Sequence, residues 1–324
     1  MIAEKKRIAA VSAAKTDAPL RRKLADFAQK FIDKRTWPST TAAGGAEEKP
    51  VIIGAKQFKQ PFKIKPEGVM PYQVATVETT LAEDKCVQGY EIMPTAHEVV
   101  HHVIVNVHEK GARIRGTGDE GIGGNWAAYV PGNSSRIYPN GFARKLPAGA
   151  TISFQIHYTP TGKATKDQFR MGLVVAKEPP RFAMHTAAVA NPKISIPPGE
   201  ANHTEIAQKP VPGAMNVTAF MAHMHVRGKA FRFEVVTADG KTETLLDIPL
   251  RLQLAAPLRT EGAAHAPARQ PGKITAVYDN RPANKANPDP TKTVRWGQQT
   301  YDEMMIGYIE YFTQMSAVQK VAMK

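Results

Sequence analysis

Short apolar runs separated by turn-forming residues dominate the chain from Val51 onward. Runs such as HHVIVNV, ATISFQIHY, RMGLVVA and FRFEVV are rich in β-branched and aromatic side chains, and clusters of Gly, Pro and Asn separate them. Runs of this length and composition favour strands over helices. The 24 Gly and 25 Pro among 324 residues supply the many turns that such strands need. The pattern therefore predicts an all-β fold.

A break in this series occurs in KEPPRF, where Pro179 and Pro180 adjoin. Proline cannot donate a hydrogen bond to a sheet, so a central strand cannot continue through this pair. A fresh series of strands follows, and each half of the chain carries its own histidine-rich strand. We predict two tandem antiparallel β-sandwich domains of jelly-roll-like type, over residues 50–180 and 181–324.

The first 49 residues have a different character. In LRRKLADFAQKFIDK, residues 20–34, Leu20, Leu24, Phe27 and Phe31 follow helical spacing with charges between them, which predicts one short amphipathic helix. The stretch STTAAGGAEEKP then indicates a linker. Such a helix offers a place where a protein partner could dock.

Composition narrows the classes of function. No apolar run approaches the roughly 20 residues that cross a bilayer, and no apolar segment of a signal peptide is visible at the N-terminus, so we expect neither. The net charge is +14, but the Lys and Arg are scattered and match no nucleic-acid-binding motif, so no nucleic-acid partner is expected. Cys86 is the single cysteine, which excludes an intrachain disulfide and a CxxC site. Metal binding must therefore rest on His, Met and carboxylates.

Histidines gather in or beside the predicted strands. Strand alternation points the neighbours His101 and His102 in opposite directions, so the pair can share a metal only at a bulge or a strand end. His157, at the end of the strand SFQIHY, could complete a three-nitrogen site with them. His108, taken alone, is interpreted as a hydrogen-bonded imidazole.

A second group lies in FMAHMHVRGK. His223 and His225 are two residues apart, which places them on one face of a strand where they can chelate one ion. Met224 should point away from them, so Met304 and Met305 in YDEMMIGYIEY are the better thioether ligands. A thioether favours Cu(I) over zinc. The alternative interpretation is that both methionines simply fill a core.

Several other polar residues receive a structural interpretation. We expect four histidines near loops to be exposed or hydrogen-bonded, Asp302 and Glu303 to orient Met304 or cap a turn, and the sequon at Asn133 to be accidental. The four histidines are His97, His185, His203 and His265.

Taken together, HHVIV, QIHYTPTG, AHMHVRGK and WGQQTYDEMMIGYIEY resemble, in order and spacing, the copper type II ascorbate-dependent monooxygenases. This family contains the peptidylglycine α-hydroxylating and dopamine β-monooxygenases. The resemblance covers about residues 60 to 315 and is closest to bacterial members that carry a loop like NRPANKANPDPT.

The resemblance implies two copper ions per chain, one in each domain. His101, His102 and His157 match the copper that transfers electrons, and His223, His225 and Met304 match the copper where dioxygen binds. It also implies that ascorbate or another reductant supplies electrons, that an organic substrate is hydroxylated, and that the protein works in the periplasm or outside the cell. The tyrosine of the family's catalytic site is retained as Tyr308.

Two departures bear on the substrate. The family's peptide-binding arginine is Met221 here, and the asparagine two residues after the methionine ligand is Ile306. Both changes remove polar groups, so we expect a small or apolar substrate rather than a peptide. The alternative hypothesis is a non-catalytic copper-binding or scaffold subunit of a larger assembly that keeps the same fold.

Overall fold

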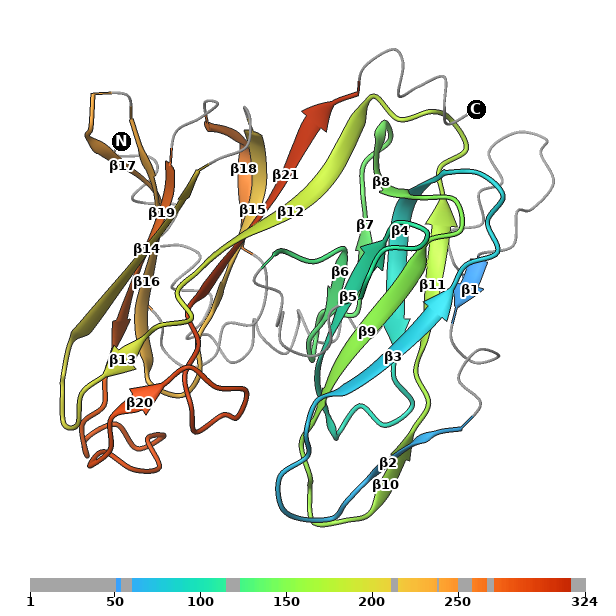
Figure 1. Cartoon of the computed structure of the whole chain (residues 1–324). Coiled ribbons are helices and arrows are strands. Elements are labelled where there is room, and N and C mark those ends of the chain that lie inside the picture. The colour runs from blue at the N-terminus through green and yellow to red at the C-terminus, as the bar shows by residue number, and fades with distance from the viewer. Residues whose placement is uncertain are drawn as a thin grey trace, which may run out of the picture. The chain divides into compact units, whose positions relative to one another are not determined.

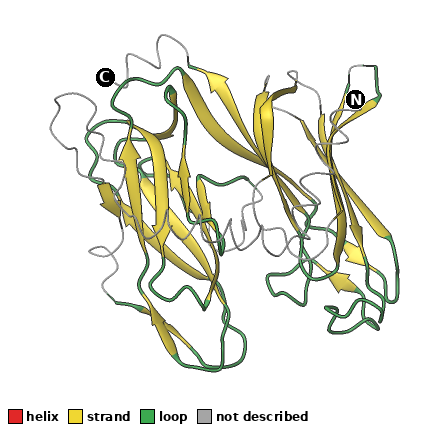
Figure 2. Cartoon of the chain, turned by 180° about the vertical axis from the view of Figure 1, so that it is seen from behind, coloured by secondary structure: helices red, strands yellow, loops and turns green. Residues whose placement is uncertain are grey.

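The computed structural model describes residues 51–53, 60–114, 123–210, 215–237, 239–249, 258–266 and 271–315, of which 51–53 and 258–266 are described by their backbone alone. The helix predicted over residues 20–34 and the linker after it lie outside these ranges. Residues 50–324 form one compact unit. The predicted all-β fold is confirmed, since every regular element among the described residues is a strand (Figures 1 and 2). The described part contains no helix long and apolar enough to pass through a membrane.

The strands follow one another along the chain at short intervals. They are β1 (Val51–Ile53), β2 (Phe62–Ile64), β3 (Gln73–Glu78), β4 (Lys85–Met93), β5 (Val100–His108), β6 (Ala127–Tyr129), β7 (Ser135–Ile137), β8 (Phe142–Leu146), β9 (Thr151–Tyr158), β10 (Thr165–Asp167), β11 (Arg170–Val175), β12 (Phe182–Ala190), β13 (Ser195–Ile196), β14 (His203–Pro210), β15 (Met215–His223), β16 (Gly228–Val236), β17 (Thr242–Pro249), β18 (Leu258–Ala266), β19 (Pro271–Tyr278), β20 (Val294–Arg295) and β21 (Ile306–Gln314).

The first half of the unit is a sandwich. The sheet β3-β9-β5-β6 packs against β11, β4 and β8 of a nine-stranded sheet. Between them lies one hydrophobic core, to which Val87 and Leu173 contribute from one sheet and Val105 and Phe154 from the other. The central strand β9 is buried along nearly its whole length, which agrees with its apolar sequence TISFQIHY.

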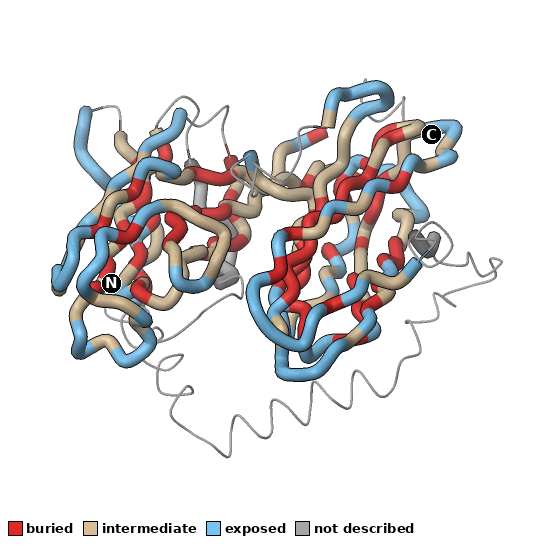
Figure 3. Tube along the Cα trace, turned by 60° about the horizontal axis from the view of Figure 1, so that its bottom comes forward, coloured by how far each residue is buried: buried red, intermediate tan, exposed pale blue. Residues whose placement is uncertain are grey.

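The second half repeats this plan around a separate core. The sheet β14-β19-β16-β17 packs against β12, β21 and β15. Phe231 and Ile274 face Val217 and Met305 across the core. Strand β19 alternates between buried and partly exposed residues at every position, as a strand covered on one face should. Figure 3 shows buried stretches in both halves.

One sheet runs through both halves. β8 of the first half pairs in parallel with β12 of the second, with Phe142 opposite Phe182 and Ala143 opposite Ala183. The rings of Phe142 and Phe182 stack with centroids 4.7 Å apart, and Phe312 of β21 packs against both at 5.1 and 5.0 Å. Hydrogen bonds and aromatic contacts therefore join the two halves directly. The boundary predicted at residue 180 falls between β11 and β12.

Candidate metal centre

A β-bulge brings two neighbouring histidines together at the start of β5. Val100 pairs with Tyr158 and His102 pairs with His157, so β5 carries one residue more than β9 at this point. The extra residue is His101, and the bulge turns its ring toward that of His102 instead of away from it. The Nδ1 atoms of the two rings lie 3.1 Å apart. This is the irregularity that the sequence required if the pair was to share a metal.

His157 completes a cluster of three imidazoles. The possible ligand atoms of His101, His102 and His157 all lie within 4.8 Å of one another. His102 and His157 are buried, whereas His101 is exposed. The Nδ1 atom of His157 is buried and has no hydrogen-bond partner within the part of the chain that the structure describes. A buried nitrogen without a partner is costly, and a metal ion would satisfy it.

Tyr72 packs over this cluster, and sequence reasoning did not single it out. Its ring centroid lies 4.6 Å from that of His157 and 5.5 Å from that of His102. Its hydroxyl donates a 3.4 Å hydrogen bond to the carbonyl oxygen of Gln298, in the second half of the chain. No local pattern marks this tyrosine, because its role comes entirely from contacts with distant segments.

The second cluster differs in one respect from the prediction. Strand β15 ends at His223, so His225 lies beyond it and the two histidines do not share a strand face. The chain turns there, and the rings are nearly perpendicular with centroids 5.3 Å apart. His225 Nδ1 lies 3.2 Å from the carbonyl oxygen of Asp302, which can only accept, so this nitrogen carries the hydrogen. The Nε2 lone pair of His225 is thereby left for a metal.

The adjacent methionines have separate environments. Met304 lines the cavity that both histidine clusters border, whereas Met305 is fully buried in the core of the second half. Of these two methionines, Met304 borders the same cavity as His223 and His225, and Met305 fills the core. Met224 also borders the cavity, contrary to the expectation from strand alternation, because β15 ends one residue before it.

Glu303 holds the loop of the second cluster in place. It is fully buried, and its carboxylate accepts hydrogen bonds from the backbone N–H groups of His225 at 2.8 Å, Arg227 at 2.6 Å and Met304 at 3.3 Å. One side chain thus fixes the backbone at two candidate ligands. The sequence left open whether Glu303 orients Met304 or caps a turn. The hydrogen bond from the Met304 N–H group agrees with the first of these interpretations.

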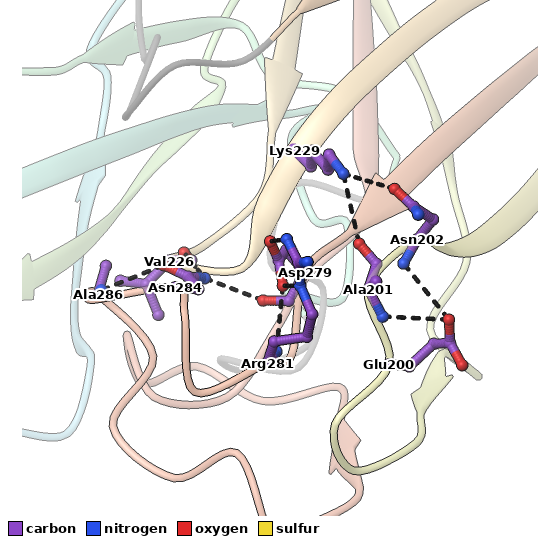
Figure 4. A network of polar contacts seen from close by, with 9 residues as sticks. All are labelled: Glu200, Ala201, Asn202, Val226, Lys229, Asp279, Arg281, Asn284 and Ala286. Atoms are coloured by element: carbon purple, nitrogen blue, oxygen red, sulfur yellow. Dashed lines mark hydrogen bonds and ion pairs between the residues drawn. The ribbon is translucent and has the colours of Figure 1, made fainter.

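A second layer of polar contacts supports the same loop. The buried guanidinium of Arg227 donates to Asn280 Oδ1 at 3.0 Å and to the carbonyl oxygen of Tyr301 at 2.8 Å. Asn284 donates to the carbonyl oxygens of Val226 at 3.2 Å and Asp279 at 2.9 Å, as Figure 4 shows. Both asparagines belong to the loop sequence NRPANKANPDPT. The Asn-rich loop was the sequence feature from which this support of the second cluster could have been predicted.

Both clusters border a single cavity of about 280 Å³. The ring centroids of His102 and His223 are 6.3 Å apart. Met221 and Tyr308 also line this cavity, and they are direct cross-strand neighbours on β15 and β21. The structure therefore brings together all seven residues predicted for the two metal sites and the catalytic site.

Burial keeps these imidazoles neutral. It lowers the pKa of His157 and of His223 to about 3, and that of His225 to about 4, and the neighbouring histidines add to the effect. The pKa of His102 is lowered well below its usual value for the same reasons. A neutral imidazole is the form that ligates a metal. Burial also raises the pKa of Glu303 to about 7, against the opposing effect of its three N–H donors and Arg227.

The remaining histidines whose side chains are described have ordinary partners. His108 Nε2 lies 2.8 Å from Ser153 Oγ, and His185 Nε2 lies 3.0 Å from Thr313 Oγ1. His203 pairs with Glu205 at 2.9 Å, and His97 Nδ1 lies 3.3 Å from the Tyr129 hydroxyl. The side chain of His265 lies outside the described residues. The cavity is bordered by none of the four described histidines, which are His97, His108, His185 and His203.

The donor sets fit copper. Three imidazoles accept both Cu(I) and Cu(II), and two imidazoles with a thioether favour Cu(I). No carboxylate lines the cavity, so the hard oxygen ligands preferred by Mg²⁺ and Ca²⁺ are missing from its described wall.

Comparisons with known proteins give no relative by sequence: no family model and no curated protein matches the chain. Among solved structures, the major capsid protein P2 from bacteriophage PM2 is similar over 83% of this chain and 99% of that chain, with a TM-score of 0.32 and 9% identity. A structure of infectious bursal disease virus, Gt strain, is similar over 84% of this chain and 74% of that chain, with a TM-score of 0.24 and 6% identity. Similarities this weak carry no argument about family or function.

Proposed function

We propose that this protein is a copper-dependent monooxygenase that hydroxylates a C–H bond of an organic substrate with O2 and a reductant such as ascorbate. The observation that carries the proposal is that two groups of neutral donors, one with three imidazoles and one with two imidazoles and a thioether, border the same cavity. One oxygen atom of O2 enters the C–H bond and the other leaves as water. Two electrons and two protons from the reductant balance the reaction.

The two groups suit different tasks. His101, His102 and His157 form the all-imidazole set, which is suited to passing electrons because it accepts both oxidation states of copper. His223, His225 and Met304 form the set in which the thioether favours Cu(I). Copper bound at these residues supplies one-electron redox chemistry and a place for O2.

The chain's own residues position the donors and shape the cavity. Glu303 and the carbonyl oxygen of Asp302 fix the backbone and ring of His225. Met221 and Tyr308 form the wall beside His223, where a substrate carbon would lie. Ile306 is fully buried and packs in one hydrophobic cluster with Met221 and Tyr308. The mostly apolar wall supports a substrate whose reacting end is apolar.

Copper stoichiometry after anaerobic Cu(I) loading tests the proposal first. Wild type should bind two coppers, and His102→Ala and His225→Ala should each bind one. His108→Ala is a matched control for His102→Ala, because His108 lies on the same strand and is hydrogen-bonded to Ser153. It should bind two coppers. Absence of specific copper in wild type would contradict the proposal.

Oxygen consumption then separates an enzyme from a binding protein. The loaded wild type should consume O2 with ascorbate and a substrate, and His225→Ala should not, because the thioether-containing site is lost. Two coppers without turnover on any class of substrate would instead support the alternative of a non-catalytic copper-binding subunit.

A further inference from the structure

A smaller cavity of about 70 Å³ adjoins the histidine-lined cavity. The two share wall residues, including Asn125, Met221 and Tyr308, so they adjoin at these residues. The smaller cavity has room for roughly two water molecules, or for one carboxylate group. It lies where β7 and β8 of the first half approach β12 and β21 of the second.

The wall of this smaller cavity carries an excess of positive charge. Arg136 and Arg144 line it with one acidic side chain, Glu310, and no second acid is present among its described wall residues. All three side chains are largely buried, with exposed fractions of 15%, 5% and 16%. Two guanidinium groups and one carboxylate leave one positive charge without a counter-ion. An anion that enters the cavity would balance this charge.

The two arginines differ in how far their donors are used. Arg144 donates to the Tyr138 hydroxyl at 2.7 Å, to the Asn125 carbonyl oxygen at 3.2 Å and to the Thr186 hydroxyl, so it is tied into the structure. Arg136 donates to Glu310 and lies over the Tyr138 ring, and its other N–H groups have no partner among the described residues. Arg136 is thus the group with free donors at this cavity.

Glu310 itself has no need of a further donor. Its carboxylate accepts from Arg136, from the Tyr138 hydroxyl at 3.2 Å and from the Thr218 hydroxyl at 3.2 Å. The side-chain amides of Asn125 and Asn133 also line the cavity and have no described hydrogen-bond partner. A guanidinium with free donors and two amides form a set that suits an anion with several acceptor oxygens.

The strands give the distance between this cavity and the metal centre. Glu310 pairs with Ala219 and Ile306 pairs with His223 in the same regular stretch of β15 and β21, four residues apart. At a rise of about 3.3 Å per residue, the two levels are roughly 13 Å apart. Met221 and Tyr308 lie at the level halfway between them. A ligand that joins the two must therefore have an extended apolar body.

We propose that the smaller cavity binds the carboxylate of an amphipathic organic acid through Arg136, while the apolar body extends past Met221 and Tyr308 toward His223. This inference rests on the proposed monooxygenase function and assigns its substrate class. It refines the expectation of a small or apolar substrate, because the apolar body carries a carboxylate at the end away from the reacting carbon. Arg136 is then a specificity-determining residue, on β7 of the first half, whereas Met221 lies on β15 of the second.

Calorimetric titration of the metal-free full chain tests the proposal without depending on copper. The probes are octanoate, its neutral analogue octanamide, and butanoate, which lacks most of the apolar body. Wild type should bind octanoate at least about tenfold more tightly than octanamide, because hydrogen bonds to charged groups are the strong ones. Butanoate should bind more weakly than octanoate. Equal affinity for octanoate and octanamide would overturn the proposal.

Two variants and a control assign the effect to Arg136. Arg136→Met should abolish the preference for octanoate, whereas Arg232→Met, at an exposed pair with Asp247, should retain it. Glu310→Gln should tighten octanoate binding, because it removes the one acid among the described wall residues of the cavity. This variant tests the proposal if Arg136→Met fails to fold. A preference that survives in a folded Arg136→Met, or octanoate binding that is unchanged or weaker in Glu310→Gln, would overturn the proposal. If wild type binds no copper specifically but prefers octanoate as expected, the proposed monooxygenase activity is contradicted and the proposed carboxylate site is not.

Discussion

The imidazole rings of His102 and His223 lie edge to face with centroids 6.3 Å apart. His102 comes from β5 of the four-stranded sheet of the first half, and His223 comes from β15 of the nine-stranded sheet. The parallel pairing of β8 with β12 lies within the nine-stranded sheet, so this one sheet packs against the sheet of His102 in the first half and carries His223 in the second. Removal of both rings from water, and the closeness of other histidines, hold the pKa values of His102 and His223 far below the usual value.

Acid should destabilise the metal-free protein well above the pH at which most carboxylates protonate. The pKa values of His157 and His223, about 3, and of His225, about 4, lie below the usual value of 6.5. The unfolded chain therefore binds more protons below pH 6.5, and stability falls as the pH drops from 6.5 toward 4. Each of these groups costs about 2 kcal/mol between pH 6.5 and 5. Above about pH 7.5 these groups are unprotonated in both states, and their effect is constant.

Urea unfolding at pH 7, 6 and 5 measures this dependence. His157→Gln should show a shallower fall between pH 6.5 and 5 than wild type, because it removes one of the groups that titrate. Asp239→Asn is the control, because Asp239 is exposed. This variant should leave the dependence of the unfolding free energy on pH unchanged between pH 6.5 and 5. Equal unfolding free energies at pH 7 and pH 5 would contradict the burial of neutral imidazoles.

Glu303→Gln should weaken metal binding at the second cluster and leave the first intact. The substitution keeps the shape of the side chain but replaces an oxygen that accepts from backbone N–H groups with an NH2 group that cannot. The expected loss of unfolding free energy is about 2 kcal/mol, and copper affinity at His223, His225 and Met304 should fall roughly tenfold or more. Competition with a Cu(I) chelator measures the affinity.

Glu234→Gln is the matched control for this change. Glu234 is also buried in the second half, but it pairs with Lys273 and Thr275 and does not touch the cavity. It should lower stability without changing copper affinity. If the two variants change copper affinity equally, Glu303 has only a general structural role.

Gly124→Ala should cost far more stability than Gly132→Ala. Both glycines have positive φ angles, 102° and 84°, so a side chain strains the backbone of both by about 1 kcal/mol. A Cβ at Gly124 would also overlap the backbone carbonyl of Thr186, whereas nothing lies within 4 Å of one at Gly132. The additional cost should be about 2 kcal/mol or more, because backbone on both sides must shift. Urea unfolding of the two variants measures the difference, and equal losses would contradict the close approach of residue 124 to β12.

The sequence predicted the features that repeat along the chain. The strands could be predicted because β-branched and aromatic residues alternate with turns, and β19 shows that alternation in its burial. The histidine clusters could be predicted because HH and HMH are unusual within strands. For His101 and His102, strand alternation showed that the pair could share a metal only at a bulge or a strand end. The sequence could not show that a bulge is present.

The features it missed depend on contacts between distant segments. Tyr72 packs over His157, and the Glu303 carboxylate accepts a hydrogen bond from the His225 N–H group. The sequence around Tyr72 or Glu303 gives no indication of these contacts. The end of β15 at His223 was also missed, since the alternating pattern continues through His225 while the backbone turns away. Side-chain chemistry was thus easier to predict than the point at which a strand ends.

Met304→Leu and Met305→Leu form a pair that separates ligand from core. Both replacements keep an apolar side chain of similar volume, so each should cost less than about 1.5 kcal/mol of unfolding free energy. Met304 lines the histidine-bordered cavity, whereas Met305 packs in the core of the second half. Met304→Leu should therefore lose Cu(I) affinity at the second cluster, by tenfold or more in chelator competition, because the soft thioether is gone. Met305→Leu should retain wild-type affinity. X-ray absorption at the copper edge should show a sulfur ligand in Met305→Leu and none in Met304→Leu, and a sulfur ligand that persists in Met304→Leu would transfer the role to Met224, the other thioether at the cavity wall.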